Sequence, residues 1–73
     1  MNKEDLKFAL QTINGFYNDI DMLVQVHNNE IGYIVTIAEF DSHREVRAYD
    51  VGDTNGLALF LTGMLEVIRV SKY

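Results

Sequence analysis

The side chains best suited to chemistry in this sequence are two histidines and one serine near the predicted turns. His27 and His43 lie at opposite ends of a central strand predicted over residues 31–40, about 30 Å apart at roughly 3.3 Å per residue. That separation prevents the two rings from sharing a metal ion or a proton within one chain. Ser42 has only His43 beside it, and neighbouring strand residues point to opposite faces. We therefore predict no catalytic residue and no metal site.

A short polar stretch gives the only hint of a metal loop in the sequence. Residues 53–56, Asp-Thr-Asn-Gly, resemble part of a calcium-binding loop, but the first ligand position would be Val51 and the position of the bidentate acid would be Thr62. Neither side chain can coordinate the ion as that loop requires. The stretch instead predicts the start of a helix, and we expect no cofactor.

Composition and charge exclude several classes of function. A chain of 73 residues, 48% hydrophobic and 23% charged, is typical of one small globular domain covering residues 1–73. Eleven acidic and six basic residues give a net charge of −5, which disfavours direct nucleic-acid binding because phosphates repel it. No apolar run reaches the roughly 20 residues of a membrane span, and the absence of cysteine favours a cytoplasmic location.

The length of the chain also indicates association. Below about 70–80 residues a single core seldom supplies more than ~3–5 kcal/mol, so small domains usually add a disulfide, a metal or a partner subunit. This sequence contains no cysteine, and its two histidines cannot form a structural zinc site. We therefore expect a homo-oligomer.

The first helix is predicted over residues 3–14. Its apolar residues recur at helical spacing, at Leu6, Ala9, Leu10 and Ile13. Asn2 can cap its start, and the pair Asn14-Gly15 is a typical helix stop.

The second helix is predicted over residues 54–70, after a turn in which Asp53 or Thr54 can act as the cap. Its broad apolar stripe consists of Leu57, Phe60, Leu61, Met64, Leu65 and Ile68. Gly63 lowers the helix propensity, so we expect it to permit close packing against a sheet.

Three strands are predicted between the helices, over residues 20–27, 31–40 and 43–51, because apolar and polar residues alternate there with a period of two. Asn28-Asn29 and Asp41-Ser42 are the expected two-residue turns. This register places His27 opposite Glu30 and Glu39 opposite Arg44.

Both predicted hairpins direct the same set of residues to one side of the sheet. The set is Met22, Val24, Val26, Ile31, Tyr33, Val35, Ile37, Val46 and Ala48. We therefore predict an α+β fold of order α-β-β-β-α, in which two helices cover one face of a three-stranded antiparallel sheet.

The opposite face of this predicted sheet is more apolar than a solvated face would be. Ile34 is expected opposite Tyr49 and beside Leu23. The solvated side of an antiparallel sheet is normally polar. We therefore predict an interface there, formed by Leu23, Ile34, Phe40, Arg47 and Tyr49. The alternative is that these residues reflect strand propensity alone.

These expectations favour a small, acidic, noncatalytic protein that self-associates and binds a macromolecular partner, which it inhibits or sequesters. Acidic surfaces complement basic sites on other proteins. The acidic residues near the turns could also imitate a row of phosphates. The alternative is a small-ligand-binding protein in which His27, Arg47 and Tyr49 hold an anionic ligand between subunits.

The order of the elements is similar in outline to that of double-stranded-RNA-binding domains. Those domains carry lysines at the start of the second helix, where this chain has Asn55-Gly56-Leu57-Ala58, so their function is not implied. Several small acidic phage inhibitors of nucleic-acid enzymes are similar in size, charge and layout, without a shared motif. An accessory protein of phage or mobile-element type is therefore suggested by analogy only.

Overall fold

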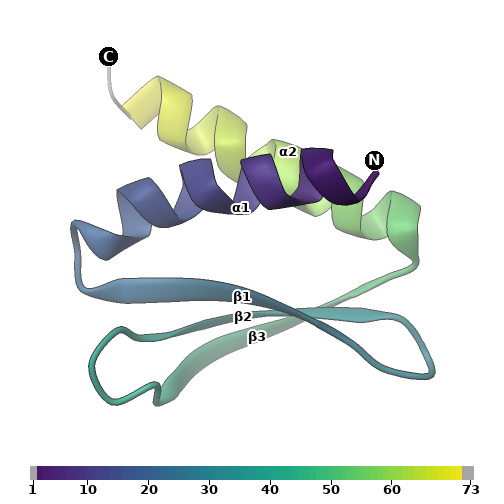
Figure 1. Cartoon of the computed structure of the whole chain (residues 1–73), viewed down its shortest axis with the longest axis horizontal. Helices are drawn as coiled ribbons and strands as arrows, with labels where there is room; N and C mark the ends of the chain where they lie inside the picture. Colours follow the sequence, from purple (N-terminus) through teal and green to yellow (C-terminus); the bar gives the residue numbers. More distant parts are fainter. Residues whose placement is uncertain (1, 72–73) are drawn as a thin grey trace.

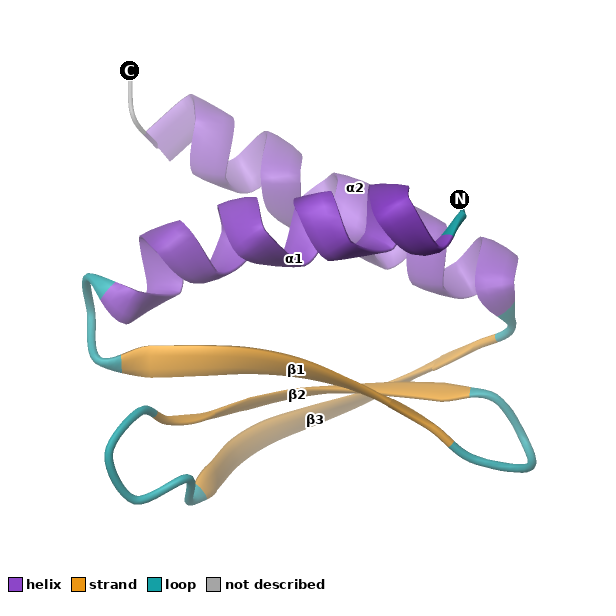
Figure 2. Cartoon of the chain, viewed as in Figure 1, coloured by secondary structure: helices purple, strands orange, loops and turns teal. Residues whose placement is uncertain are grey.

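The computed structural model describes residues 2–71 and confirms the predicted order of helices and strands (Figures 1 and 2). The elements are α1 (Lys3–Asn18), β1 (Met22–Asn28), β2 (Tyr33–Glu39), β3 (Glu45–Gly52) and α2 (Thr54–Ser71). β2 lies between β1 and β3 in one antiparallel sheet. Both helices lie on the same face of that sheet, so the chain forms the predicted two-layer α+β domain.

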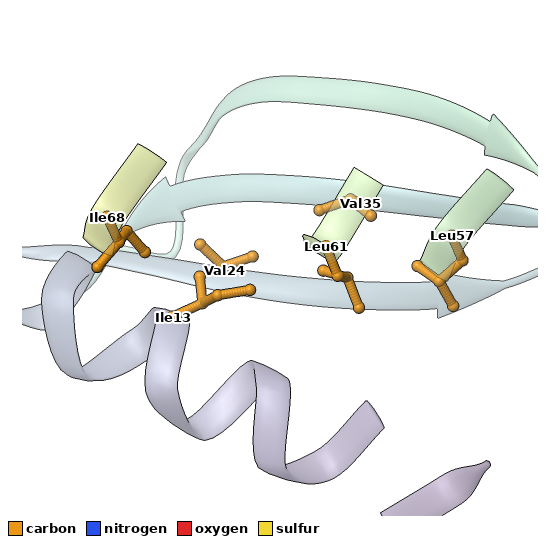
Figure 3. Packing of buried hydrophobic residues seen from close by; sticks show 6 residues of the cluster. All are labelled: Ile13, Val24, Val35, Leu57, Leu61 and Ile68. Carbon is orange, nitrogen blue, oxygen red and sulfur yellow. The ribbon is translucent and has the colours of Figure 1, made fainter. Parts of the chain in front are cut away.

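A single cluster of apolar side chains fills the space between the helices and the sheet. Figure 3 shows its six fully buried members, which come from both helices and from the first two strands: Ile13, Val24, Val35, Leu57, Leu61 and Ile68. Each belongs to an apolar pattern that the sequence analysis identified. β3 contributes no buried residue, and most of it is exposed. The core therefore rests mainly on β1 and β2.

Helix α1 is one turn longer than predicted. The pair Asn14-Gly15 does not end it, and the helix continues to Asn18. Phe16 and Tyr17 in this last turn pack against the core, so tertiary contacts outweigh the local stop signal. Between α1 and β1 the residue with positive φ is Asp21, with φ of 60°.

Asn14 has a different role from the predicted one, because its side chain binds the backbone of β1. Its Nδ2 donates a hydrogen bond to the Val24 carbonyl at 2.9 Å, and its Oδ1 accepts one from the Val24 N–H at 2.7 Å. β1 is an edge strand, so these two groups have no neighbouring strand to bond. The amide of Asn14 thus fastens α1 to the open edge of the sheet.

The first hairpin has a longer loop than predicted. Asn28 pairs with Tyr33, which leaves residues 29–32 in the loop, and His27 pairs with Ile34 rather than with Glu30. The Oδ1 of Asn29 accepts hydrogen bonds from the N–H groups of the second and third residues after it, which stabilises the four-residue turn. The register moves by an even number of residues, so the residues that face the helices are unchanged.

The second hairpin contains a β-bulge that the sequence did not predict. Near the loop the predicted register holds, because the Glu39 N–H donates to the Arg44 carbonyl at 2.9 Å and Ala38 pairs with Glu45. The pairing then shifts by one residue between Ile37 and Ala38. The predicted helix-facing position of Ala48 is therefore wrong, because Ala48 pairs with Thr36 of the outer face, and Val46 is the residue of the bulge that has no partner in β2.

The bulge reverses the two faces of β3. Val35 pairs with Tyr49, and Ile37 pairs with Arg47. Residues directly opposite one another project from the same side of a sheet, so Tyr49 and Arg47 face the helix side. Asp50 consequently faces away from the helices, which avoids burying a carboxylate against the core.

Helix α2 begins as predicted, and Asp53 is its cap. The Asp53 Oδ1 accepts a hydrogen bond from the Gly56 N–H at 2.9 Å. A Cβ at Gly56 would collide with the carbonyl of Val51, so the close approach of the β3 end to the helix requires glycine. The prediction for Gly63 is wrong, because a Cβ there would meet nothing within 4 Å.

We predict that Asn14→Ala lowers the free energy of unfolding by about 1–3 kcal/mol, because the Val24 N–H and carbonyl both lose their partner. Alanine is the better helix former, so helix propensity alone would raise the stability instead. Urea denaturation measures the change, with Asn18→Ala at the exposed end of α1 as the control, expected within about 0.5 kcal/mol of the parent. An equal effect at both positions would contradict the role given to Asn14.

Candidate functional site

The five residues predicted to form an interface do not share one surface. Leu23 and Ile34 lie on the outer face of the sheet, and Phe40 lies in the loop after β2 with 44% of its surface exposed. Arg47 and Tyr49 project from the helix side of β3 because of the bulge. Their predicted position on the outer face is therefore wrong, while their part in an interface stays a prediction.

The contact between Tyr49 and α2 supports this placement. The Tyr49 ring lies 5.1 Å from the ring of Phe60, centroid to centroid, with the two planes tilted by 41°. Such aromatic pairs add to the stability of a packed surface. The ring of Tyr49 therefore helps to join the exposed strand β3 to α2.

The outer face of the sheet is less apolar than predicted. Ile34 lies between His27 of β1 and Asp50 of β3, and not beside Tyr49. Leu23 pairs with Ala38, four residues along β2 from Ile34, so about 13 Å separates the two large apolar side chains. The predicted apolar strip on this face is therefore interrupted by polar side chains.

The middle of the outer face is already covered by its own neighbours. Thr36 and Ala38 of the central strand are only 8% and 3% exposed. The hydroxyl of Thr36 is 3.1 Å from the Nε2 of His27, so a hydrogen bond joins the two side chains across β1 and β2. This bond gives His27 a structural role and satisfies a polar group that is nearly buried.

The three residues of the ligand-binding alternative do not converge within one chain. His27 is engaged with Thr36 on the outer face, whereas Arg47 and Tyr49 project from the other side of the sheet. A pocket that used all three would need residues from two chains.

Ser42 and the acidic residue Glu39 have structural partners. The Ser42 hydroxyl donates to the Glu39 carboxylate at 3.0 Å, and it accepts a hydrogen bond from the Arg44 N–H at 3.2 Å. The Arg44 side chain bonds the same carboxylate at 2.8 Å. These contacts stabilise the loop between β2 and β3. Among residues 2–71 no group of three metal-binding side chains comes together, and neither helix is long and apolar enough to cross a membrane.

A large exposed apolar surface lies on helix α2. Leu59, Val67 and Val70 have 76%, 67% and 71% of their surfaces exposed, and Gly63 stands between the first two. These positions are four, four and three residues apart, so they stand on one face of the helix. We call these four residues the α2 face. A glycine in the exposed middle of a helix costs about 1 kcal/mol relative to alanine, and no contact within the chain offsets that cost.

An open groove borders the α2 face. It has a volume of about 420 Å³ and runs between α2 and the C-terminal turn of α1. Its lining is apolar and shares residues with the α2 face: Phe16, Tyr17, Leu59, Phe60, Gly63, Met64, Val67 and Ile68. We call this the α1–α2 groove. The rings of Phe16 and Tyr17 stand edge to face, 5.6 Å apart, and so form a fixed wall.

A second groove runs along the outer side of α1 to the edge of β1. Its volume is about 850 Å³, and Leu6, Leu10 and Leu23 line it together with Lys3 and Lys7. These are both lysines of the described residues 2–71. This groove therefore combines an apolar floor with positive charge on a chain that is acidic as a whole.

The sequence analysis did not identify the α2 face. The predicted stripe of the second helix ended at Ile68 and left out Leu59, Val67 and Val70. A signal was present, since between residues 57 and 70 the only charged or hydroxyl side chains are Thr62, Glu66 and Arg69. A helix that is apolar around most of its circumference needs burial on more than one side.

Comparison of the chain with family models, curated proteins and solved structures gives no match.

We predict that Tyr49→Ala lowers the free energy of unfolding by about 1–2 kcal/mol, less than the ~3–5 kcal/mol of a fully buried aromatic, because the residue is 39% exposed. Tyr49→Phe keeps the ring against Phe60 and should stay within about 0.5 kcal/mol of the parent. Chemical denaturation of the two variants measures both values. Unchanged stability in Tyr49→Ala would argue against the contact with α2.

Proposed function

We propose that this chain is a small, noncatalytic interaction protein that self-associates and binds a macromolecular partner. The observation that carries the proposal is the α2 face, where three large apolar side chains of one helix are at least two-thirds exposed beside an open apolar groove. Isolated apolar residues are normal on protein surfaces, but a contiguous apolar patch marks an interaction site.

The energy of burying the α2 face supports association. Full burial of a leucine or valine side chain is worth about 1.5–3 kcal/mol. Covering the 67–76% of these three side chains that is exposed would therefore contribute roughly 3–6 kcal/mol per chain. In a symmetric dimer the same patch is buried twice, which gives roughly 6–12 kcal/mol. That sum is comparable to the cost of association, about 4–15 kcal/mol. A symmetric dimer is therefore favoured over a one-sided contact of the same size.

The small core supports the same proposal. The fully buried cluster contains six large side chains, and the sequence has no cysteine with which to add a disulfide. Domains of this length commonly gain stability from a partner subunit. Association would supply it by burying further apolar surface.

The macromolecular partner is part of the proposal as well. The net charge of −5 fits a partner with a basic surface, because complementary charges speed association and exclude partners of like charge. The outer face of the sheet, with Leu23, Ile34 and the nearby Phe40, is the surface proposed for this partner. Binding there would inhibit or sequester the partner without chemistry, and a cytoplasmic location fits a chain without cysteine.

A small anionic ligand is the second candidate function. The observation that favours it is the 850 Å³ groove, where Lys3 and Lys7 stand beside leucine side chains. This site differs from the pocket predicted from His27, Arg47 and Tyr49. A volume of that size is within the usual range of small-molecule sites, about 300–1,000 Å³.

We predict that the protein has twice the mass of one chain in solution at micromolar concentration. Static light scattering over a dilution series measures this mass, and dissociation on dilution gives the affinity. A mass of one chain throughout the series would remove self-association from the proposed function.

We also predict that no member of a nucleotide and metabolite panel raises the melting temperature by several degrees. A ligand at 100 times its dissociation constant stabilises a protein by about 2.7 kcal/mol, so a true ligand would be evident in a thermal-shift experiment. A large shift that Lys3→Gln with Lys7→Gln abolishes would favour the small-ligand function instead.

A further inference from the structure

We infer that a second copy of this chain covers the α2 face, and that the two α2 helices cross antiparallel at Gly63 about a two-fold axis. This inference rests on the self-association proposed above and names the surface and the geometry that produce it. The self-association interface is thereby placed on α2, whereas the sequence analysis predicted it on the outer face of the sheet.

The first argument is the position of Gly63. It lies in the middle of α2, it is exposed, and a Cβ built on it would meet nothing within 4 Å. Packing within one chain therefore does not require glycine at this position, although glycine weakens a helix. Small residues at a helix crossing allow two backbones to approach closely, so a second helix across this point would account for the glycine.

The second argument is the match between the residues on either side of Gly63. In an antiparallel two-fold pair, a residue four positions before Gly63 lies opposite the residue four positions after it in the other chain. Leu59 therefore faces the partner's Val67, and Val67 faces the partner's Leu59. Both side chains are more than two-thirds exposed in one chain, and the pairing covers them with apolar partners.

The third argument is that one chain carries both complementary shapes. Leu59 projects from α2 with 76% of its surface exposed, and the apolar α1–α2 groove opens beside it. Under two-fold symmetry the projecting side chains of each copy lie next to the groove of the other. Figure 1 shows the C-terminal half of α2 rising away from the sheet, and Val67 and Val70 in this half are 67% and 71% exposed.

The fourth argument is charge. The described length of α2, from Thr54 to Ser71, has two charged side chains, Glu66 and Arg69, which neutralise one another across 3.6 Å. Two copies therefore meet on this helix without repulsion, although each chain has a net charge of −5. The outer sheet face carries Glu45 and Asp50 near its β3 edge, and a two-fold contact there would bring carboxylates together.

The extent of the surface suits a stable dimer. A standard interface buries about 800 Å² per partner, which is roughly 15% of the 5306 Å² of this chain. The 18 residues of α2 span about 27 Å at 1.5 Å per residue, close to the 32 Å of the longest dimension of the molecule. A contact along this helix and its groove can therefore reach the required size.

Cysteine crosslinking tests the geometry directly, because the sequence contains no cysteine to interfere. Gly63→Cys places a thiol on the two-fold axis, so mild oxidation should produce a disulfide-linked dimer. Thr62→Cys is the matched control, since this neighbour is exposed on the charged side of the helix. Leu59→Cys mixed with Val67→Cys should crosslink faster than either variant alone. Equal crosslinking at positions 62 and 63 would overturn the inference.

A second set of variants tests the same surface without a covalent bond. Gly63→Gln adds a good helix former at the crossing, so the monomer should become more stable while the dimer dissociation constant rises about tenfold or more. Thr62→Gln should leave that constant unchanged. Tighter or equal dimerisation of Gly63→Gln would overturn the crossing at this residue.

The outcomes separate this inference from the proposed function. Dimers that resist the α2 variants but dissociate in Ile34→Thr would overturn the inference and leave self-association standing through the sheet. A parent protein that stays monomeric would overturn both. A monomer whose melting temperature rises with dodecanoate, and whose rise Gly63→Gln abolishes, would identify the groove as a ligand site and overturn the dimer.

Discussion

The space between the helices and the sheet is too small to contain all the apolar side chains of the chain. Two helices form one layer on one face of a three-stranded sheet, so the fold has a single interior layer (Figure 1). Apart from Ala38 on the outer face, seven apolar residues are buried, whereas nine large ones among residues 2–71 are exposed. A small domain cannot avoid this surplus, because surface grows relative to volume as chains shorten. The surface on which these exposed apolar residues cluster is the one best suited to bind another molecule.

The β-bulge between β2 and β3 decides how much of that surplus the sheet displays. Without it, Asp50 would project toward the helices, and Tyr49 and Val51 would project outward. With it, Val51 packs against the core and Tyr49 meets Phe60. The outer face then presents Ile34 between His27 and Asp50, which is a mixed and partly polar surface. The bulge at Val46, with a second register shift beside Val51, thus places the apolar side chains of Tyr49 and Val51 on the helix side of the sheet and not on its outer face.

The fold was largely predictable from the sequence because its periodicities are strong, whereas the interacting surface was not. The predicted register of the first hairpin was wrong by four residues. Each residue was nevertheless assigned to the correct face of the sheet, since an even shift leaves the faces unchanged. The bulge was not predicted, because the alternation of apolar and polar residues continues through it without a break, and only the structure shows Tyr49 against Phe60. The end of α1 was wrong for a similar reason, since Asn14 bonds a strand ten residues later. The sequence shows that Leu59 and Val67 are apolar. It does not show which side of this mostly apolar helix packs against the sheet, because that depends on tertiary contacts.

The amide of Asn14 also has a consequence for how large an assembly can become. An open strand edge is a template on which further strands can add without limit, and that growth produces fibres. At Val24 this edge is already occupied by a side chain that presents one donor and one acceptor, as a peptide group of another strand would. The chain therefore blocks strand addition at the middle of β1. On this side of the sheet the chain is therefore protected against the open-ended strand addition that leads to aggregation.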